Sequence, residues 1–244
     1  MDEEGAELME FLVDAAAWFR DPHNWQGSNG VPARVLEHLY YSGVATLIAL
    51  GLALPVGLFS GHTGRGGALA INVANIGRAL PTFGLIILAV IMMGLGDLPI
   101  FIALVAFAIP PVLTNSYAGI RAVDPDIRDA AEGVGMTGWQ VLWHLEVPVA
   151  LPLILAGIRT SAVQVVATAT LAAYAGSGGL GRYIVNGFAV RDFPQIFAGA
   201  LLVALLAVLI ELVFGRLQAL VVSEGLAART AQANADAKMT SAAA

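Results

Sequence analysis

The chain has 244 residues, of which 58% are hydrophobic and only 12% are charged, and its mean hydropathy is +0.77. Soluble domains carry about 25% charged residues, so this composition predicts a membrane protein. The net charge of −6 argues against a nucleic-acid partner. The chain has no cysteine, which excludes disulfides, and its single lysine, Lys238, excludes a P-loop of the GxxxxGK[ST] type. Any ATP hydrolysis must therefore come from another chain.

The first 37 residues form a segment that is polar to amphipathic and rich in acids. Apolar residues recur at helical spacing, and acids occupy much of the other face. This pattern predicts a short helix on the membrane surface that ends at the Asp21-Pro22 pair. Because the acids leave no basic n-region, the segment is not a secretory signal. Its apolar residues are Leu8, Phe11, Leu12, Ala15, Trp18 and Phe19.

Five apolar stretches follow, and each is long enough to cross a bilayer, which takes about 20 residues. Gly57 and Gly61 in the first stretch form a GxxxG pattern, which allows close helix contact. Pro81 should break the second stretch, and Arg78 should face protein, water or the membrane interface. The predicted spans are about 38–60, 68–95, 98–120, 147–175 and 196–220, and we expect residues 223–244 to be disordered.

Two of these spans each carry several polar side chains. The third contains Asn115 with Thr114 and Tyr117, and the fourth places Thr160, Gln164 and Thr168 on one helix face. One interpretation is that Asn115, Thr160, Gln164 and Thr168 line a path for a polar solute. The alternative is that they form hydrogen bonds that hold the helices together.

The segment 121–146, between the third and fourth spans, has mixed charge and an ordered pattern. Asp129 should lie near a helix start, where the helix dipole favours an acid. Ala130 and Ala131 let a partner surface approach closely, and Gly135 allows a turn that a β-carbon would hinder. An amphipathic run then leads to Pro148. The pattern fits a docking element, and an ordinary solvated loop is the alternative.

This segment resembles the EAA loop of the membrane subunits of ABC importers. That loop has the order EAA, three residues, Gly, nine residues, an aliphatic, one residue, an aliphatic and Pro. Asp129-Ala130-Ala131, Gly135, Leu145, Val147 and Pro148 fall at those places, with Asp129 where the family has Glu. The resemblance implies an ATPase-docking set, which comprises Asp129, Ala130, Ala131, Glu132, Gly135, Leu145 and Pro148.

The resemblance extends beyond the loop. Residues 151–181 are very similar to permeases for glycine betaine, carnitine and choline, and Arg78-Ala79-Leu80-Pro81-Thr82 looks like a motif of osmolyte importers. Within this stretch, residues 176–181 match GxGxxG, but they follow a membrane helix rather than a strand, so the dinucleotide-binding interpretation fails. In the family, the glycine run leads into an extracytoplasmic segment.

The resemblance implies an all-α membrane protein with the type I ABC importer permease fold, in a bacterial plasma membrane. It divides the chain into an extracytoplasmic segment 1–37, a permease domain 38–222 and a cytoplasmic tail 223–244. The partners it implies are ABC ATPase subunits, a solute-binding protein, and a second permease subunit that is either identical or paralogous. It implies no catalytic residue, cofactor or metal on this chain.

The resemblance, which places the docking loop in the cytoplasm, implies an orientation and a class of solute. With the docking loop inside, the N-terminus lies outside and the C-terminus in the cytoplasm, which agrees with a slight excess of positive charge inside. The expected solute is an osmoprotectant-type quaternary ammonium compound, and another small polar solute is the alternative. A secondary transporter would need ionisable residues at mid-membrane, where Arg159 is the one candidate. A purely structural membrane protein would not need the polar-striped third and fourth spans.

Overall fold

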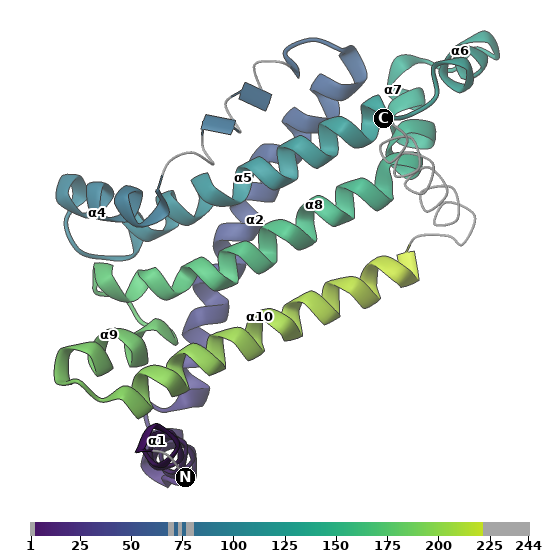
Figure 1. The fold of residues 1–244 in the computed structure, drawn as a ribbon. Coiled ribbons are helices and arrows are strands. Elements are labelled where there is room, and N and C mark those ends of the chain that lie inside the picture. The colour runs from purple at the N-terminus through teal and green to yellow at the C-terminus, as the bar shows by residue number, and fades with distance from the viewer. Residues whose placement is uncertain (1–2, 68–70, 73–74, 77–80, 222–244) are drawn as a thin grey trace.

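The computed structural model describes residues 3–67, 71–72, 75–76 and 81–221, and every regular element in these ranges is helical (Figure 1). Four of the described helical runs are long and apolar enough to cross a membrane, and a shorter apolar helix, α4 (Thr82–Met93), lies between the first two. The predicted all-helical membrane fold is therefore confirmed. The four runs are α2 (Val31–Thr63), α5 (Asp97–Arg121), residues 138–175 including α8 (Val147–Thr168), and α10 (Phe193–Val221).

The first membrane helix starts earlier than its apolar stretch does. Gly30 is the N-cap of α2 and a proline stands in the first turn, where its missing N–H costs nothing. Arg34 and Glu37 then pair at 2.7 Å with the i,i+3 spacing of a helix. The helix thus begins seven residues before the predicted span of 38–60, because two polar turns precede the uncharged stretch and are part of the same helix.

Pro81 breaks the second apolar stretch as predicted. It is the N-cap of α4 with extended backbone, and the helix begins at Thr82 and ends at Met93. Arg78 and the tail 223–244 lie outside the described residues, as does most of the stretch before Pro81. The break follows from the missing N–H of proline and from the steric restriction that it imposes on the preceding turn.

Small residues let the membrane helices approach closely. A β-carbon on Gly57 of α2 would lie 2.8 Å from Ser116 Cβ on α5, and one on Gly61 would lie 2.7 Å from Ile120 Cβ. The GxxxG pattern is therefore used at a real helix contact. The core beside it is built largely from alanines of α2, α5 and the 3₁₀ turn η3 (Ala169–Ala175), with Ile86, Ile100 and Leu104 among them.

The fourth membrane helix is part of a longer run that starts inside the predicted docking loop. The turns α7 (Gly138–Val141) and η2 (Leu142–Glu146) lead directly into α8 and then η3. Thr137 and Gln140 form a capping box at the start. Pro148 cannot donate a hydrogen bond to the preceding turn, and η2 is a π-helical turn in which Val147 N–H donates to Leu142 O, five residues back. The predicted docking loop 121–146 is thus largely helical, with α6 (Pro125–Gly133) in its first half and α7 and η2 in its second.

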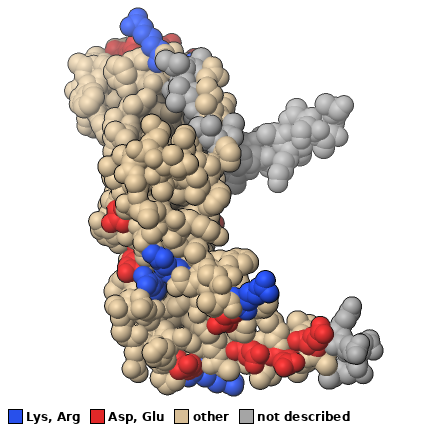
Figure 2. All heavy atoms as spheres, turned by 90° about the vertical axis from the view of Figure 1, so that its left-hand side faces the viewer, with Lys and Arg blue, Asp and Glu red and all other residues tan. Residues whose placement is uncertain are grey.

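The N-terminal helix α1 (Glu3–Arg20) lies across the end of the bundle. Figure 1 shows α1 end-on and α10 from the side. It ends before Asp21-Pro22 as predicted, and the 3₁₀ turn η1 (Pro22–Trp25) follows. Phe11 packs edge-on against Phe197 of α10, and Trp18 packs against Tyr183 of α9 (Gly181–Val190). Leu8, Met9, Leu12 and Val13 stay exposed, and Figure 2 shows acidic side chains along this helix.

Candidate functional site

A short helix, α6 (Pro125–Gly133), follows α5 and carries most of the predicted docking residues. Asp124 caps it by accepting a hydrogen bond from Asp126 N–H at 2.9 Å, and Pro125 occupies its first turn. The expectation that Asp129 lies near the helix start is wrong, because Asp129 is the fifth residue of nine. The Asp124-Pro125 pair is the start signal of the helix.

Gly135 closes α6 with a left-handed turn. Its φ is +90°, and no atom lies within 4 Å of the place that a β-carbon would take. Gly135 N–H donates to Glu132 O at 2.9 Å, and Met136 N–H donates to Ala131 O at 3.1 Å. The predicted turn with positive φ is therefore present, and glycine is needed there for its backbone conformation.

Five of the predicted docking residues lie together on α6 and its closing turn, at the end of the bundle opposite α1 and α9 (Figure 1). All of them are exposed except Ala131, which is half-buried. The other two, Leu145 and Pro148, lie at the foot of α8, where Leu145 is half-buried and Pro148 is exposed. The five on α6 and its turn are Asp129, Ala130, Ala131, Glu132 and Gly135.

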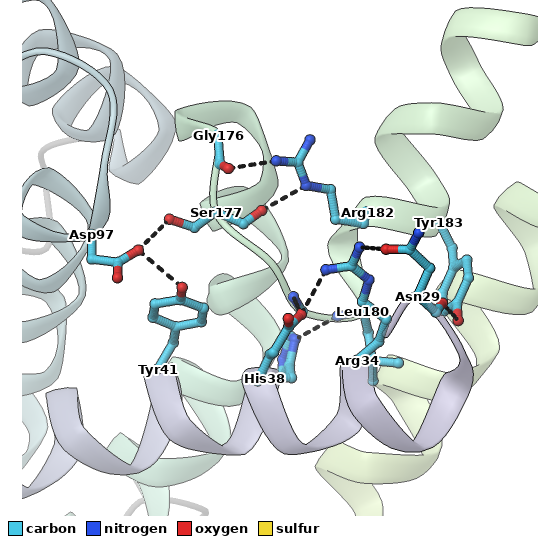
Figure 3. Close-up of polar contacts among 12 residues, drawn as sticks. Asn29, Arg34, His38, Tyr41, Asp97, Gly176, Ser177, Leu180, Arg182 and Tyr183 are labelled. Carbon is cyan, nitrogen blue, oxygen red and sulfur yellow. Dashed lines mark hydrogen bonds and ion pairs between the residues drawn. The ribbon is translucent and has the colours of Figure 1, made fainter. Parts of the chain in front are cut away.

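At the opposite end, polar contacts hold the glycine run 176–181 against the start of α2 (Figure 3). Glu37 accepts a hydrogen bond from Gly179 N–H at 2.8 Å. The buried His38 accepts at Nδ1 from Leu180 N–H at 3.3 Å. Its Nε2 therefore carries the proton and donates to Val166 O at 2.8 Å. These bonds fix one neutral tautomer of His38.

Asp97, the first residue of α5, completes this outer network (Figure 3). Tyr41 and Ser177 both donate to its Oδ1, at 2.9 and 2.6 Å. Arg182 of α9 donates to the Ser177 and Gly176 carbonyl oxygens, at 2.7 and 2.5 Å. The network therefore joins α2, α5 and α9 through the glycine run, whose role here is close packing and backbone hydrogen bonding.

Tyr183 links α9 to the turn before α2. Its hydroxyl donates to Asn29 O at 2.7 Å. Burial raises the pKa of Tyr183, with a smaller opposing effect from Arg34 and a smaller raising effect from Glu37. The hydroxyl therefore stays protonated at physiological pH and remains a donor.

The family comparison agrees with this arrangement. Residues 53–224 match the family described as "Binding-protein-dependent transport system inner membrane component". The chain belongs to this family. The matched range begins inside α2 and includes α6, its closing turn and the glycine run.

Several relatives of this permease carry substrate names. It is 35% identical over 190 residues to the "Glycine betaine/carnitine/choline transport system permease protein OpuCB" of Bacillus subtilis (strain 168), covering 78% of this chain and 88% of that protein. It is 36% identical over 182 residues to the "Carnitine transport permease protein OpuCB" of Listeria monocytogenes, covering 75% and 84%. It is 32% identical over 195 residues to the "Osmoprotectant import permease protein OsmW" of Salmonella typhimurium, covering 78% and 91%.

A solved structure supports the fold. A chain of the inward-facing MetNI methionine ABC transporter aligns with a TM-score of 0.66 over 78% of this permease and 95% of that chain, at 20% identity. The expected type I ABC importer fold is therefore confirmed for this permease.

The predicted path residues of the permease lie on two adjacent helices. On α8, Thr160 and Gln164 are exposed and Thr168 is half-buried. Asn115 of α5 is half-buried and donates to Pro111 O of its own helix at 2.8 Å. It packs beside Gly157, three residues before Thr160, where a β-carbon would lie 2.6 Å from Asn115 Cβ. Asn115 is thus near the α8 face, and its amide is engaged within α5.

Arg159 of the permease is paired with an acid on another membrane helix. Its guanidinium forms an ion pair with Glu211 of α10, and both side chains are partly exposed. In the sequence, Arg159 is the one mid-membrane candidate for ion coupling. The two charges compensate each other, which removes the unpaired charge that such a role suggested.

Two polar clusters were missed from the sequence. One is the network around His38 and Asp97, and the other surrounds the buried Glu146 beside α6. The available signal was position, because Glu37, Asp97 and Glu146 each flank an apolar span. Position alone does not reveal their partners. Asp97 and Glu37 bind residues on other elements that are 56 to 142 positions away in the sequence.

Proposed function

We propose that this permease forms the translocation path of an ATP-driven importer for an osmoprotectant-type quaternary ammonium solute. The observation that carries the importer role is the exposed helix α6 with its left-handed Gly135 turn, displayed at one end of the membrane bundle. The solute class is supported by the names of the relatives, which include glycine betaine, carnitine and choline. Another small polar solute is the alternative.

Three kinds of partner follow from this role. An ABC ATPase would bind the exposed docking residues on α6 and at the foot of α8. A solute-binding protein would approach the opposite end, beside α1 and α9. A second permease subunit, identical or paralogous, would complete the path. Alternating access then requires α6 to fit two arrangements of the ATPase, which bind it with different free energies.

The path itself would lie along α8. Thr160 and Gln164 are exposed hydrogen-bonding side chains on a mostly apolar helix, and Thr168 continues their face. An uncharged polar face suits a solute that carries its own charges, because it exchanges hydrogen bonds without binding the solute tightly. Asn115 would contribute from α5.

In this arrangement the N-terminus lies outside the cell and the C-terminus in the cytoplasm. This orientation needs five spans, and we propose that they are the four long helical runs and a fifth that includes the shorter apolar helix α4. Placing α6 in the cytoplasm puts α1 on the outer membrane surface, with its exposed Leu8, Met9, Leu12 and Val13 at the lipid interface.

Uptake by membranes that contain the permease with its ATPase and binding protein tests the function. Radiolabelled glycine betaine, carnitine and choline should accumulate only with ATP, and excess unlabelled betaine should compete. A membrane that takes up none of these, while it transports another small polar solute with ATP, would show that the solute class is wrong. Uptake that persists without the ATPase would overturn the importer assignment.

A further inference from the structure

A buried carboxylate joins the docking helix to the membrane helices. Glu146 is the last residue of η2, and only 1% of its side chain is exposed. Its Oε1 lies 2.9 Å from Arg128 Nε on α6, and its Oε2 lies 2.7 Å from His62 Nδ1 in the last turn of α2. One side chain at the foot of α8 therefore contacts two other elements.

Arg128 extends this connection to α5. Its Nη2 donates to Ile120 O at the end of α5, and 17% of its side chain is exposed. Its Nε lies within ion-pair distance of Glu146 but does not meet the geometry of a hydrogen bond. The contact therefore depends on the opposite charges, and it connects the ends of α2, α5, α6 and α8.

Apolar packing contributes little to holding α6 in place. No residue of α6 is buried, whereas α2, α5 and α8 each bury many side chains. A buried ion pair often adds little stability compared with well-packed apolar residues, although removing one partner is costly. An ion pair at this place is better explained by its effect on the orientation of α6.

We propose that Glu146 is a positioning residue that transmits displacement of α6 to α2, α5 and α8. This inference rests on the proposed function, because it requires an ATPase to move α6. When α6 moves, Arg128 moves with it, and its attraction to Glu146 moves the foot of α8. His62 transmits the same displacement to the end of α2. Glu146 itself contacts neither nucleotide nor solute.

The first test is Glu146→Gln in the assembled transporter, with radiolabelled glycine betaine as the probe. The amide keeps the size of the side chain and removes its charge. We expect uptake per permease to fall roughly tenfold or more, while ATP hydrolysis per complex stays within about twofold and the ATPase still copurifies. Glu10→Gln, the same change at an exposed position of α1, should leave uptake unchanged. Normal uptake by Glu146→Gln would overturn the proposal.

A double variant separates coupling from folding. Either single change removes the charged partner of the other residue, which lowers the membrane level. Glu146→Gln leaves Arg128 with the Ile120 carbonyl alone, and Arg128→Gln leaves the buried Glu146 with His62 alone. Arg128→Gln with Glu146→Gln removes both charges, so the membrane level should recover. Uptake should not recover with it, because two neutral amides lack the attraction between opposite charges on which the contact depends. If uptake returns in proportion to the membrane level, the pair is only structural and the proposal is wrong.

A distance measurement tests the proposal without any solute. The chain has no cysteine, so spin labels can be placed on Ile127→Cys in α6 and Arg65→Cys just after α2, both at exposed positions. We expect one narrow label–label distance in the nucleotide-free and ATP-trapped states, and a broad distribution once Glu146→Gln is added. Labels that separate on ATP trapping in the otherwise unchanged chain would overturn the proposal. A transporter that moves no betaine counts against the solute class alone and leaves this result intact.

Discussion

At the scale of single residues, the glycines of this permease have two different physical roles. Gly135 has open space around it and a φ of +90°, so it is needed for conformation. Gly157 has an ordinary helical backbone but is pressed against α5, so it is needed for its lack of volume. Substitutions at the two positions should therefore fail in different ways, one in coupling and one in stability.

Gly135→Val should abolish coupling while leaving insertion intact. A residue with a β-carbon costs about 1 kcal/mol or more in left-handed backbone, and a β-branched one costs more. The turn would relax and displace the surface around Asp129 to Ala131. We expect a near-normal membrane level, no solute-stimulated ATP hydrolysis or uptake, and weaker copurification of the ATPase.

The control for this change is Gly66→Val. Gly66 is also exposed, with a φ of +75° and no atom within 4 Å of a β-carbon, but it lies outside α6. The Gly66→Val variant should have a similar local strain and should transport at the normal rate. If Gly135→Val transports at the normal rate with the ATPase bound, α6 and its turn are an ordinary loop.

At the scale of elements, α5 and α8 are held together by close backbone approach and one hydrogen bond. Ser161 Oγ donates to Ala108 O at 2.9 Å in a fully buried position. One turn away, Gly157 faces Asn115 and Pro111. Lipid offers no hydrophobic driving force between helices, so this fit of small residues supplies much of the association free energy.

Gly157→Ala should weaken the α5–α8 contact. Its β-carbon would lie 2.6 Å from Asn115 Cβ and 2.9 Å from Pro111 O, so the helices must separate. Overpacking of this kind costs roughly 1–3 kcal/mol, and it should lower the thermal midpoint in detergent. Gly51→Ala on α2, which has open space, should be neutral or slightly stabilising. Equal midpoints for the two variants would show that the contact tolerates a methyl group.

The polar face of α8 is tested by thiol labelling. Cysteine at Thr160, Gln164 or Thr168 should react with small water-soluble reagents, and the rate should change when ATP is trapped on the ATPase. Cysteine at Ser161, which is fully buried against α5, should stay protected in both states. Protection of all four positions in both states would mean that the face serves packing or faces lipid instead of a path.

At the scale of the whole molecule, the two ends of the bundle differ in construction. One end displays α6, a helix with no buried residue, beside the Glu146 cluster. The other is closed by α1, α9 and the network around His38 and Asp97 (Figure 3). An end with little apolar packing and a tightly hydrogen-bonded opposite end fit the proposal that an ATPase acts on the α6 end.

Topology reporters test the proposed orientation. A reporter that is active only outside the cell should work when fused before residue 1 and should fail when fused after residue 225. A reporter active only in the cytoplasm should give the opposite result with both fusions. If the outside-active reporter works only at the C-terminal fusion, the bundle is inverted and α6 cannot meet a cytoplasmic ATPase.

The sequence by itself determined the membrane class, the break at Pro81 and the glycine turn at Gly135, whereas the GxxxG pattern only allowed the helix contact that the structure shows. These properties are local, because apolar length, a missing N–H and a missing β-carbon act within a few residues. The start of α2 and the continuous run from Gly138 into α8 differed from expectation, because polar turns joined to a stable helix stay helical once it is nucleated.

Only the tertiary structure decided the partners of the buried polar groups. The contacts of Glu146 with His62, of His38 with Val166 and of Arg159 with Glu211 span 84, 128 and 52 residues. A charge in a sequence shows that burial would be costly, but it does not show which distant group compensates it. That choice depends on how the helices pack, because only their packing brings the ends of α2, α5, α6 and α8 to a single carboxylate.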